Sequence, residues 1–184
     1  MNPHFLFNML NSIKSLVRTD SEKATQVIMK LSELLRYQLY ESNDQKALLK
    51  SEINFLSNFL DLETLRRDNF STDIKLNAHG RSINSIFLPP NLFTTFVENA
   101  VKHSVDTISG ASFVRVEIEV NADRLYFVCV NSKDPNYRPS KMFKSNGLGL
   151  ANITRRLELL YGHSHLLEIE SAVNKYEVKL TIPL

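Results

Sequence analysis

The hydrophobic pattern of this 184-residue chain changes its period near residue 70. Before residue 68, apolar residues recur three and four positions apart, which is the spacing of an amphipathic helix. Beyond it, stretches such as residues 112–120 alternate apolar and polar side chains, which is typical of a strand with one buried face. This order favours an α+β fold, in which a helical first part precedes helices layered on one face of a mixed sheet.

The first forty residues predict two helices, over residues 2–18 and 22–40, with Asp20 or Ser21 capping the second. The short connection between them indicates an antiparallel hairpin. Each apolar face is wider than one partner helix can cover, so we expect a homodimer that forms a four-helix bundle. The apolar residues of the first helix are Phe5, Leu6, Met9, Leu10, Ile13, Leu16 and Val17.

The rest of the chain predicts one linker, three further helices and five strands. Residues 41–47 are polar and indicate a linker, and helices are expected over residues 48–68, 88–104 and 147–160. The apolar run 125–130 predicts a central strand that is buried on both faces. Residues 132–146 are long for an unstructured connection and predict a functional loop or lid. The other strands are expected at 72–76, 112–120, 166–170 and 176–182, with turns at 79–80, 121–123 and 172–175.

Composition narrows the functional classes. The net charge is +2, which is too small to argue for binding to nucleic acid or to an anionic membrane. The single cysteine, Cys129, excludes an internal disulfide framework, and its apolar neighbours predict a buried, inert thiol. We find neither a run long enough to span a membrane nor a signal peptide. A reducing, cytosolic setting is compatible with these features.

The stretch from Leu88 to Ser104, L-P-P-N-L-F-T-T-F-V-E-N-A-V-K-H-S, combines an apolar stripe with four polar side chains. Two prolines open it, and proline is tolerated in the first turn of a helix. Asn99 and His103 are four residues apart and share one helical face, and Glu98 and Lys102 share the neighbouring face. An ordinary surface helix with a Glu98–Lys102 ion pair is the alternative interpretation.

Two other stretches carry chemically suitable residues. The sequence N-G-L-G-L, with Gly147 and Gly149, opens the last helix after a loop with several basic residues, and such a start suits a polyphosphate. A plain glycine turn is the alternative. His4 lies in the first turn of a strongly apolar helix. A neutral imidazole is a nucleophile, and its reference pKa of about 6.5 makes that form available. A histidine that packs on Phe7 or faces solvent is the alternative.

Taken together, these stretches resemble one family. N-P-H-F-L-F-N-M-L-N-S-I, residues 2–13, resembles the phosphoacceptor box of the LytS/YehU-type sensor histidine kinases. Residues 49–66 resemble the connecting helix of that family, residues 88–104 its N-box, and residues 146–162 its last glycine box with the following helix. The motifs occur in the family's order over nearly the whole chain, which is therefore identified as a member.

The resemblance implies a fold of two parts. Residues 1–47 match a helical region for dimerisation and histidine phosphotransfer. Residues 48–184 match the connecting helix and a GHKL-type ATP-binding domain, a two-layer α/β sandwich with a mixed sheet. By the same resemblance, His4 accepts the γ-phosphoryl group of ATP, and Glu98 acts as a polarising group or general base.

The resemblance also implies a nucleotide site. Asn99 matches the N-box asparagine that ligates the Mg²⁺ held by the phosphates, and an amide oxygen is a suitable ligand for that ion. The other implied contacts to ATP are the basic N-box residues Lys102 and His103 and the phosphate-cradling glycines Gly147 and Gly149.

The chain departs from the family pattern at the adenine box and after the connecting helix. Asn131 stands where the family has an aspartate that meets the adenine amino group, and Lys133 stands where a glycine is expected. An asparagine carbonyl accepts from an amino group, but without a charge; Asp134 is the alternative if the alignment shifts. Arg67 stands where an aromatic residue often follows Arg66.

The function implied is that of an ATP-dependent protein-histidine kinase in a two-component system. It phosphorylates His4 and then passes the phosphoryl group to an aspartate of a response regulator, often a LytTR-type DNA-binding protein. We expect a homodimer without direct contact to nucleic acid. Because Met1 directly precedes the phosphoacceptor box, we also expect a cytoplasmic portion of an inner-membrane protein, anchored by segments upstream.

Two other functions stay open. One is a catalytically weak nucleotide-binding or dimeric scaffold module, which the altered adenine box suggests. The other is an ATP-hydrolysing relative of the GHKL group, in which Glu98 activates water.

Overall fold

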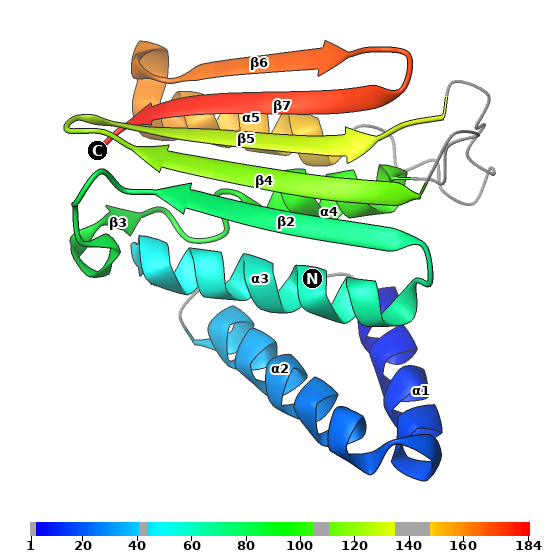
Figure 1. Ribbon diagram of the computed structural model, residues 1–184. Helices are drawn as coiled ribbons and strands as arrows, with labels where there is room; N and C mark the ends of the chain where they lie inside the picture. The colour runs from blue at the N-terminus through cyan, green and yellow to red at the C-terminus, as the bar shows by residue number, and fades with distance from the viewer. Residues whose placement is uncertain (1–2, 41–43, 105–110, 135–147) are drawn as a thin grey trace.

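The computed structural model describes residues 3–40, 44–104, 111–134 and 148–184 (Figure 1). Helices α1 and α2 lie on one side of α3, and the sheet lies on the other side. Helices α4 and α5 lie behind the sheet in this view. The chain therefore places a helical hairpin beside an α/β sandwich, as the change of hydrophobic period predicts.

The hairpin consists of α1 (Pro3–Thr19) and α2 (Ser21–Leu39). Asp20 caps α2, because its side chain accepts a hydrogen bond from the backbone nitrogen of Lys23 at 2.9 Å. This settles the choice that the sequence left between Asp20 and Ser21.

Helix α3 (Leu49–Arg66) packs against both helices of the hairpin. The ring centroids of Phe5 in α1 and Phe59 in α3 lie 5.1 Å apart. Lys30 in α2 pairs with Asp61 in α3 at 2.6 Å. Part of the hairpin's apolar surface is thus covered by α3 within the same chain.

The sheet has five strands in the order β2-β4-β5-β7-β6. Strand β2 runs parallel to β4, whereas the other neighbours are antiparallel, so the mixed sheet is confirmed. Strand β2 is longer than the predicted 72–76, because it pairs with β4 along its whole length. The strands are β2 (Phe70–Asn77), β4 (Ser112–Val120), β5 (Arg124–Ser132), β6 (Leu166–Ser171) and β7 (Lys175–Pro183).

Helices α4 (Thr94–His103) and α5 (Leu148–Tyr161) cover one face of this sheet. Phe93 stacks on Phe127 of β5 with centroids 4.5 Å apart, and Phe96 lies 5.9 Å from the same ring. Apolar side chains of β4, β5 and β7 complete the core, and the two-layer sandwich is confirmed. They are Val114, Val116, Ile118, Val120, Leu125, Cys129, Val178, Leu180 and Ile182.

Strand β5 is central, but the prediction that both of its faces are buried is wrong. Its residues alternate between buried and half-buried, and Tyr126 and Val128 belong to the half-buried set. Because side chains of a strand alternate between its two faces, these two lie on the face opposite Phe127 and Cys129. No helix of the described residues covers that face in Figure 1. Apolar side chains on an open face of a sheet are common, because the polar surface of a protein is limited.

The start of the central helix also differs from its prediction. The two-residue strands β1 (Ala47–Leu48) and β3 (Phe87–Leu88) pair with each other, and Pro89 and Pro90 follow β3. Helix α4 begins only at Thr94, after Asn91 in the left-handed region with φ of 56°. Each proline disfavours helical geometry in the residue before it, so this segment continues from the strand and then turns.

Several smaller predictions are confirmed. His79 and Gly80 form a turn with φ of 45° and 82°, and Ala172 donates to the Lys175 carbonyl in the β6–β7 hairpin. Cys129 is buried, which raises the pKa of its thiol to about 12. The predicted lid, residues 132–146, lies outside the described residues from 135 onward. Short 3₁₀ turns occur at Ile83–Ser85 and Gly162–Ser164.

None of the helices described has the length and apolar character needed to cross a membrane.

Candidate functional site

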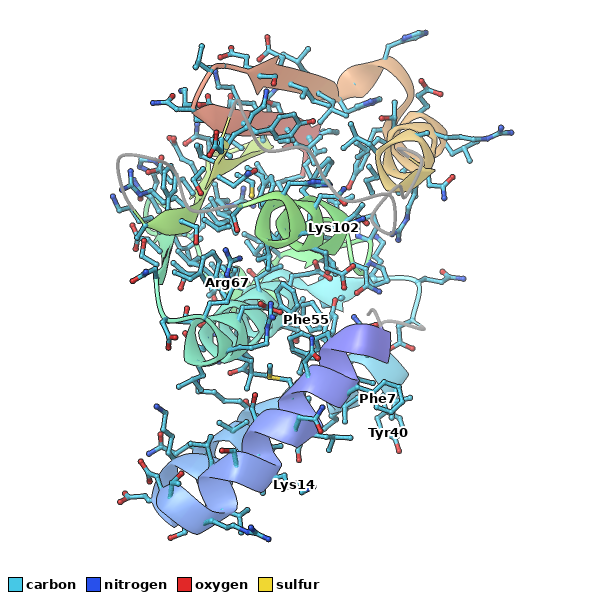
Figure 2. All side chains as sticks on the ribbon, turned by 90° about the vertical axis from the view of Figure 1, so that its right-hand side faces the viewer. Phe7, Lys14, Tyr40, Phe55, Arg67 and Lys102 are labelled. Atoms are coloured by element: carbon cyan, nitrogen blue, oxygen red, sulfur yellow. The ribbon has the colours of Figure 1, made fainter. Side chains whose placement is uncertain are left out.

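Helix α4 carries four of the predicted site residues, and they lie away from the sheet because the apolar stripe of the helix packs on it. Phe96, Val97, Ala100 and Val101 are buried, and the polar residues fall on the remaining faces. Asn99 and Glu98 are half-buried, whereas Lys102 and His103 are exposed in the last turn (Figure 2 labels Lys102). The helix thus presents an amide and a carboxylate near the protein surface, followed by two basic groups.

Asn99 lies against the first turn of α5. A β-carbon added to Gly149 would lie 3.7 Å from Asn99 Nδ2 and 3.6 Å from Thr95 Cγ2. The first turn of a helix has backbone N–H groups without partners in the helix, and it attracts anions. Two stretches some fifty residues apart in the sequence therefore place an amide beside a helix N-terminus, an arrangement suited to a phosphate group.

The environment of α4 alters two of its ionisable groups. Burial raises the pKa of Glu98, which makes its carboxylate a stronger base than an exposed glutamate. The His103 side chain is exposed, yet desolvation by the atoms packed around its ring and the neighbouring charge of Lys102 lower its pKa, which favours its neutral imidazole at neutral pH. Lys102 remains the exposed cation of this pair of basic residues.

Asn131, the residue predicted at the adenine box, is fully buried on the helix-covered face of β5. Its Nδ2 donates to the Ser132 carbonyl at 2.8 Å, so one amide hydrogen is already used within the protein. Lys133 is turned to the β6–β7 hairpin, where Nζ donates to Ser171 Oγ at 2.8 Å. Lys133 thus contacts β6 at the position where the family has a glycine.

Two predicted site residues lie partly or wholly outside the described residues. The backbone of His4 belongs to the first turn of α1, but its side chain is not described, and Gly147 lies outside the described residues altogether. The described residues contain no cluster of three or more His, Cys, Asp or Glu side chains suited to a metal ion. The amide oxygen of Asn99 is of the type that Mg²⁺ prefers, and it would be one protein ligand of such an ion.

Sequence reasoning missed a group of residues around the turn that precedes α4. Glu52 of α3 is fully buried, and Arg156 Nη2 of α5 donates to the Pro90 carbonyl at 2.8 Å. The sequence did contain one indication that Glu52 is buried: it lies three residues from both Leu49 and Phe55 and therefore shares their apolar face of the helix. A carboxylate at such a position is buried only when the fold supplies hydrogen-bond donors.

Comparison with known proteins gives the same assignment as the motifs. Residues 1–70 match the family model described as "Histidine kinase". The sensor protein LytS of Staphylococcus saprophyticus is 31% identical over 195 aligned positions, which cover 100% of this chain and 32% of that protein. The chain thus spans about a third of the length of the curated relatives it matches.

Solved structures show the same fold. The catalytic domain of the histidine kinase ThkA has a TM-score of 0.53 at 17% identity, over 75% of this chain and 93% of that domain. The histidine kinase ThkA in complex with the response regulator protein TrrA has a TM-score of 0.50 at 13% identity. That match covers 98% of this chain and 59% of the solved chain.

The motifs, the sandwich with its N-terminal hairpin and the match to LytS over the whole chain agree, and the chain belongs to the histidine kinase family as a relative of the LytS sensor proteins.

Proposed function

We propose that this chain is the kinase portion of a two-component sensor, which binds ATP with Mg²⁺, phosphorylates His4 and passes the phosphoryl group to a response regulator. Membership of the histidine kinase family supports this reaction class. The residue roles proposed are those that the motifs imply. Asn99, Lys102, His103 and Gly149 bind the phosphates, with Gly147 beside Gly149 in the same motif.

The observation that carries this proposal is the position of Asn99 next to the start of α5. Phosphoryl transfer depends mainly on positioning and on neutralising charge. The amide oxygen of Asn99, the ammonium group of Lys102, the N–H of a neutral His103 and a helix N-terminus can together position phosphate groups and offset their charge. Asn99 would hold a Mg²⁺ ion, which would supply positive charge to offset the charge of the phosphates.

The chemical step assigns roles to two residues. A neutral imidazole nitrogen of His4 attacks the γ-phosphorus, so a nitrogen–phosphorus bond forms while the bond to the β–γ bridging oxygen breaks. ADP departs with that electron pair, and Glu98 accepts the proton that the imidazole loses. The raised pKa of Glu98 supports this role, because it makes the carboxylate a better proton acceptor.

The partner proposed is a response regulator, which receives the phosphoryl group from His4 on an aspartate. A structural neighbour solved as a complex of a histidine kinase with a response regulator supports a partner of this class. The LytTR type is proposed from the family resemblance alone. We also propose a homodimer formed by the hairpin, and a position on the cytoplasmic side of the inner membrane with the anchor in other segments of the protein.

A dimeric scaffold with weak or absent nucleotide binding is the second candidate. It is favoured by Asn131, which has no charge to offer an adenine amino group and already donates one amide hydrogen to Ser132. In this alternative the hairpin transmits a signal through dimer contacts, and Asn99 ligates nothing.

The deciding experiment is a calorimetric titration of the chain with ATP, in the presence and in the absence of Mg²⁺. Mg²⁺-dependent heat of binding is the expected result, and no binding at millimolar ATP would favour the scaffold. Acid-labile phosphate from radiolabelled ATP should then appear in the chain and be absent from the His4→Gln variant. Steady release of inorganic phosphate by that variant would instead indicate an ATP-hydrolysing enzyme.

A further inference from the structure

The turn before α4, residues 90–93, is held by three other helices. Gln38 Nε2 of α2 donates to Asn91 Oδ1 at 3.0 Å, and Arg156 of α5 donates to the Pro90 carbonyl. Glu52 of α3 accepts from the backbone nitrogen of Asn91 at 2.5 Å. Helix α4 starts from this turn, so its position depends on α2, α3 and α5. Of these three helices, only α5 carries a proposed nucleotide-binding residue, Gly149.

Glu52 supplies the hydrogen-bond acceptor that α4 itself lacks. The N-cap residue Phe93 makes no side-chain cap, and the first turn of α4 contains no acidic residue. The Glu52 side chain accepts a hydrogen bond from the backbone nitrogen of Asn91, two residues before that N-cap. A side chain from another helix thus pairs a backbone N–H of the turn that leads into α4, and leaving this partly buried N–H without an acceptor would be costly.

Tyr37 connects the same side chain to the hairpin. The Tyr37 hydroxyl of α2 donates to Glu52 Oε1, and its ring packs on Phe55 with centroids 4.9 Å apart. Within the described residues, Glu52 Oε2 is buried with no hydrogen-bond partner. This unpaired oxygen indicates that few other hydrogen-bond donors lie near the Glu52 carboxylate. A shift of α2 relative to α3 would therefore remove the Tyr37 hydrogen bond without another donor to replace it.

The C-terminal end of α4 is hydrogen-bonded to the residue that follows the C-terminal end of α3. Arg67, which directly follows α3, donates to the Ser104 carbonyl at 2.9 Å and to Ser112 Oγ at 2.8 Å. Its guanidinium also lies 4.2 Å above the Phe70 ring. A cation at a helix C-terminus is favourable. Figure 2 shows Arg67 between α3 and α4, so α3 acts as a frame that holds α4 at both ends.

We propose that Glu52 is a positioning residue that fixes the start of α4, and with it Asn99, and that Tyr37 makes this position depend on the hairpin. The proposal rests on the proposed function only in giving Asn99 a role in nucleotide binding. A displacement of α2 breaks the Tyr37–Glu52 contact, loosens the turn 90–93 and moves the amide of Asn99 relative to α5.

The test compares Glu52→Leu, Glu52→Gln and Tyr37→Phe with Asp61→Asn as a matched control. Asp61→Asn weakens another contact between α2 and α3, the ion pair with Lys30, but it does not touch the turn. Two quantities are measured at a temperature at which circular dichroism shows every variant folded. They are hydrogen exchange by mass spectrometry over residues 91–103 and calorimetric affinity for ATP with Mg²⁺.

Glu52→Leu should speed exchange over residues 91–97 by about tenfold and weaken ATP binding by about tenfold, since backbone donors lose their acceptor. Glu52→Gln keeps an acceptor oxygen, so both quantities should stay within about threefold of the wild type. Tyr37→Phe keeps the ring and should speed exchange by a few-fold, whereas Asp61→Asn should change neither quantity.

Unchanged exchange over residues 91–97 in Glu52→Leu, or equal behaviour of Tyr37→Phe and Asp61→Asn, would overturn the proposal. A merely structural role would lower the melting temperature of these variants without a local change in α4. If the wild type binds no ATP, the proposed function fails and the exchange data alone decide whether Glu52 positions α4.

Discussion

The hairpin and the sandwich of this protein bury their apolar side chains to different extents. Phe93, Phe96 and Phe127 form a core that is closed within one chain. In the hairpin, Phe7 is 66% exposed and Met29 is 62% exposed, and Phe7 points outward from it (Figure 2). The sandwich also exposes apolar side chains, Leu159 among them, but the three aromatic rings of its core are enclosed, whereas the hairpin presents an apolar surface that a second copy would cover. This contrast suggests that association and nucleotide binding reside in different parts of the chain.

The largest effect that would test this separation is expected from Asn99→Ala. The variant should lose Mg²⁺-dependent ATP binding, because its methyl group ligates no metal and makes no hydrogen bond to phosphate. The dimer should stay intact, because Asn99 lies on α4 and not on the hairpin. Calorimetry and sedimentation measure the two properties. Dissociation of the dimer would mean that Asn99 is a structural residue and that the separation does not hold.

Phe127→Ala should lower the stability of the sandwich by about 3–5 kcal/mol, since it leaves a cavity beneath Phe93 and Phe96. Chemical denaturation followed by circular dichroism measures this loss. The matched variant Phe7→Ala removes a ring that is mostly exposed, and in the monomer it should change stability by less than about 0.5 kcal/mol. Similar losses in both variants would contradict the contrast between the two regions.

Phe7→Ser should instead weaken the dimer. Burying one phenylalanine contributes about 1.5–3 kcal/mol, so the dissociation constant should rise by at least tenfold. Leu159→Ser is the control, because Leu159 is 79% exposed on α5, in the sandwich, and its loss should leave association unchanged. Sedimentation over a range of concentrations distinguishes the two variants. An effect of Leu159→Ser alone would place the dimer interface on the sandwich.

The smallest expected effect is on the pH dependence of stability, through Glu52, which lies at the contact between the hairpin and the sandwich. Burial raises the pKa of Glu52 in the folded protein above its ordinary value of about 4.3, although hydrogen bonds from Tyr37, Asn91 and Phe93 oppose this. The folded state therefore holds this proton more tightly than the unfolded state does. The stability that this provides is present below the ordinary pKa and is lost as pH rises through the folded pKa.

Wild-type stability should accordingly fall relative to Glu52→Gln as pH rises above about 4.3, by at most ~1.4 kcal/mol per pH unit. Denaturation curves of both proteins at a series of pH values measure the difference. Parallel pH profiles would show that Glu52 does not take up a proton on folding, and would argue against its burial between α2, α3 and α4.

Much of the fold was predictable because helix and strand periods are local properties of the sequence. The alternation over residues 112–120 matches β4 residue for residue, and the hairpin helices agree with their predictions within two residues. The short strands β1 and β3 were missed, because pairs of two residues leave no period to detect. The open face of β5 was missed because an apolar run does not reveal how many layers cover a sheet.

The candidate site divides in the same way. Local spacing placed Glu98, Asn99, Lys102 and His103 on one helix, and the structure has them there. The position of Asn99 near Gly149 required the closure of a long chain segment. Arg67, a departure from the family pattern in the sequence, has a clear place in the structure, where it holds the end of α4 through Ser104 and Ser112.

The sequence by itself determined most of the longer helices and strands, the family and the residues that the motifs share with it, because each of these depends on spacings of a few positions. Only the tertiary structure decided that Glu52 is buried, that it accepts a hydrogen bond from the turn before α4 and that Tyr37 links it to the hairpin. The physical reason is that burial and hydrogen-bond partners depend on residues far apart in the sequence, 39 positions for Glu52 and Asn91, which come together only when the chain folds.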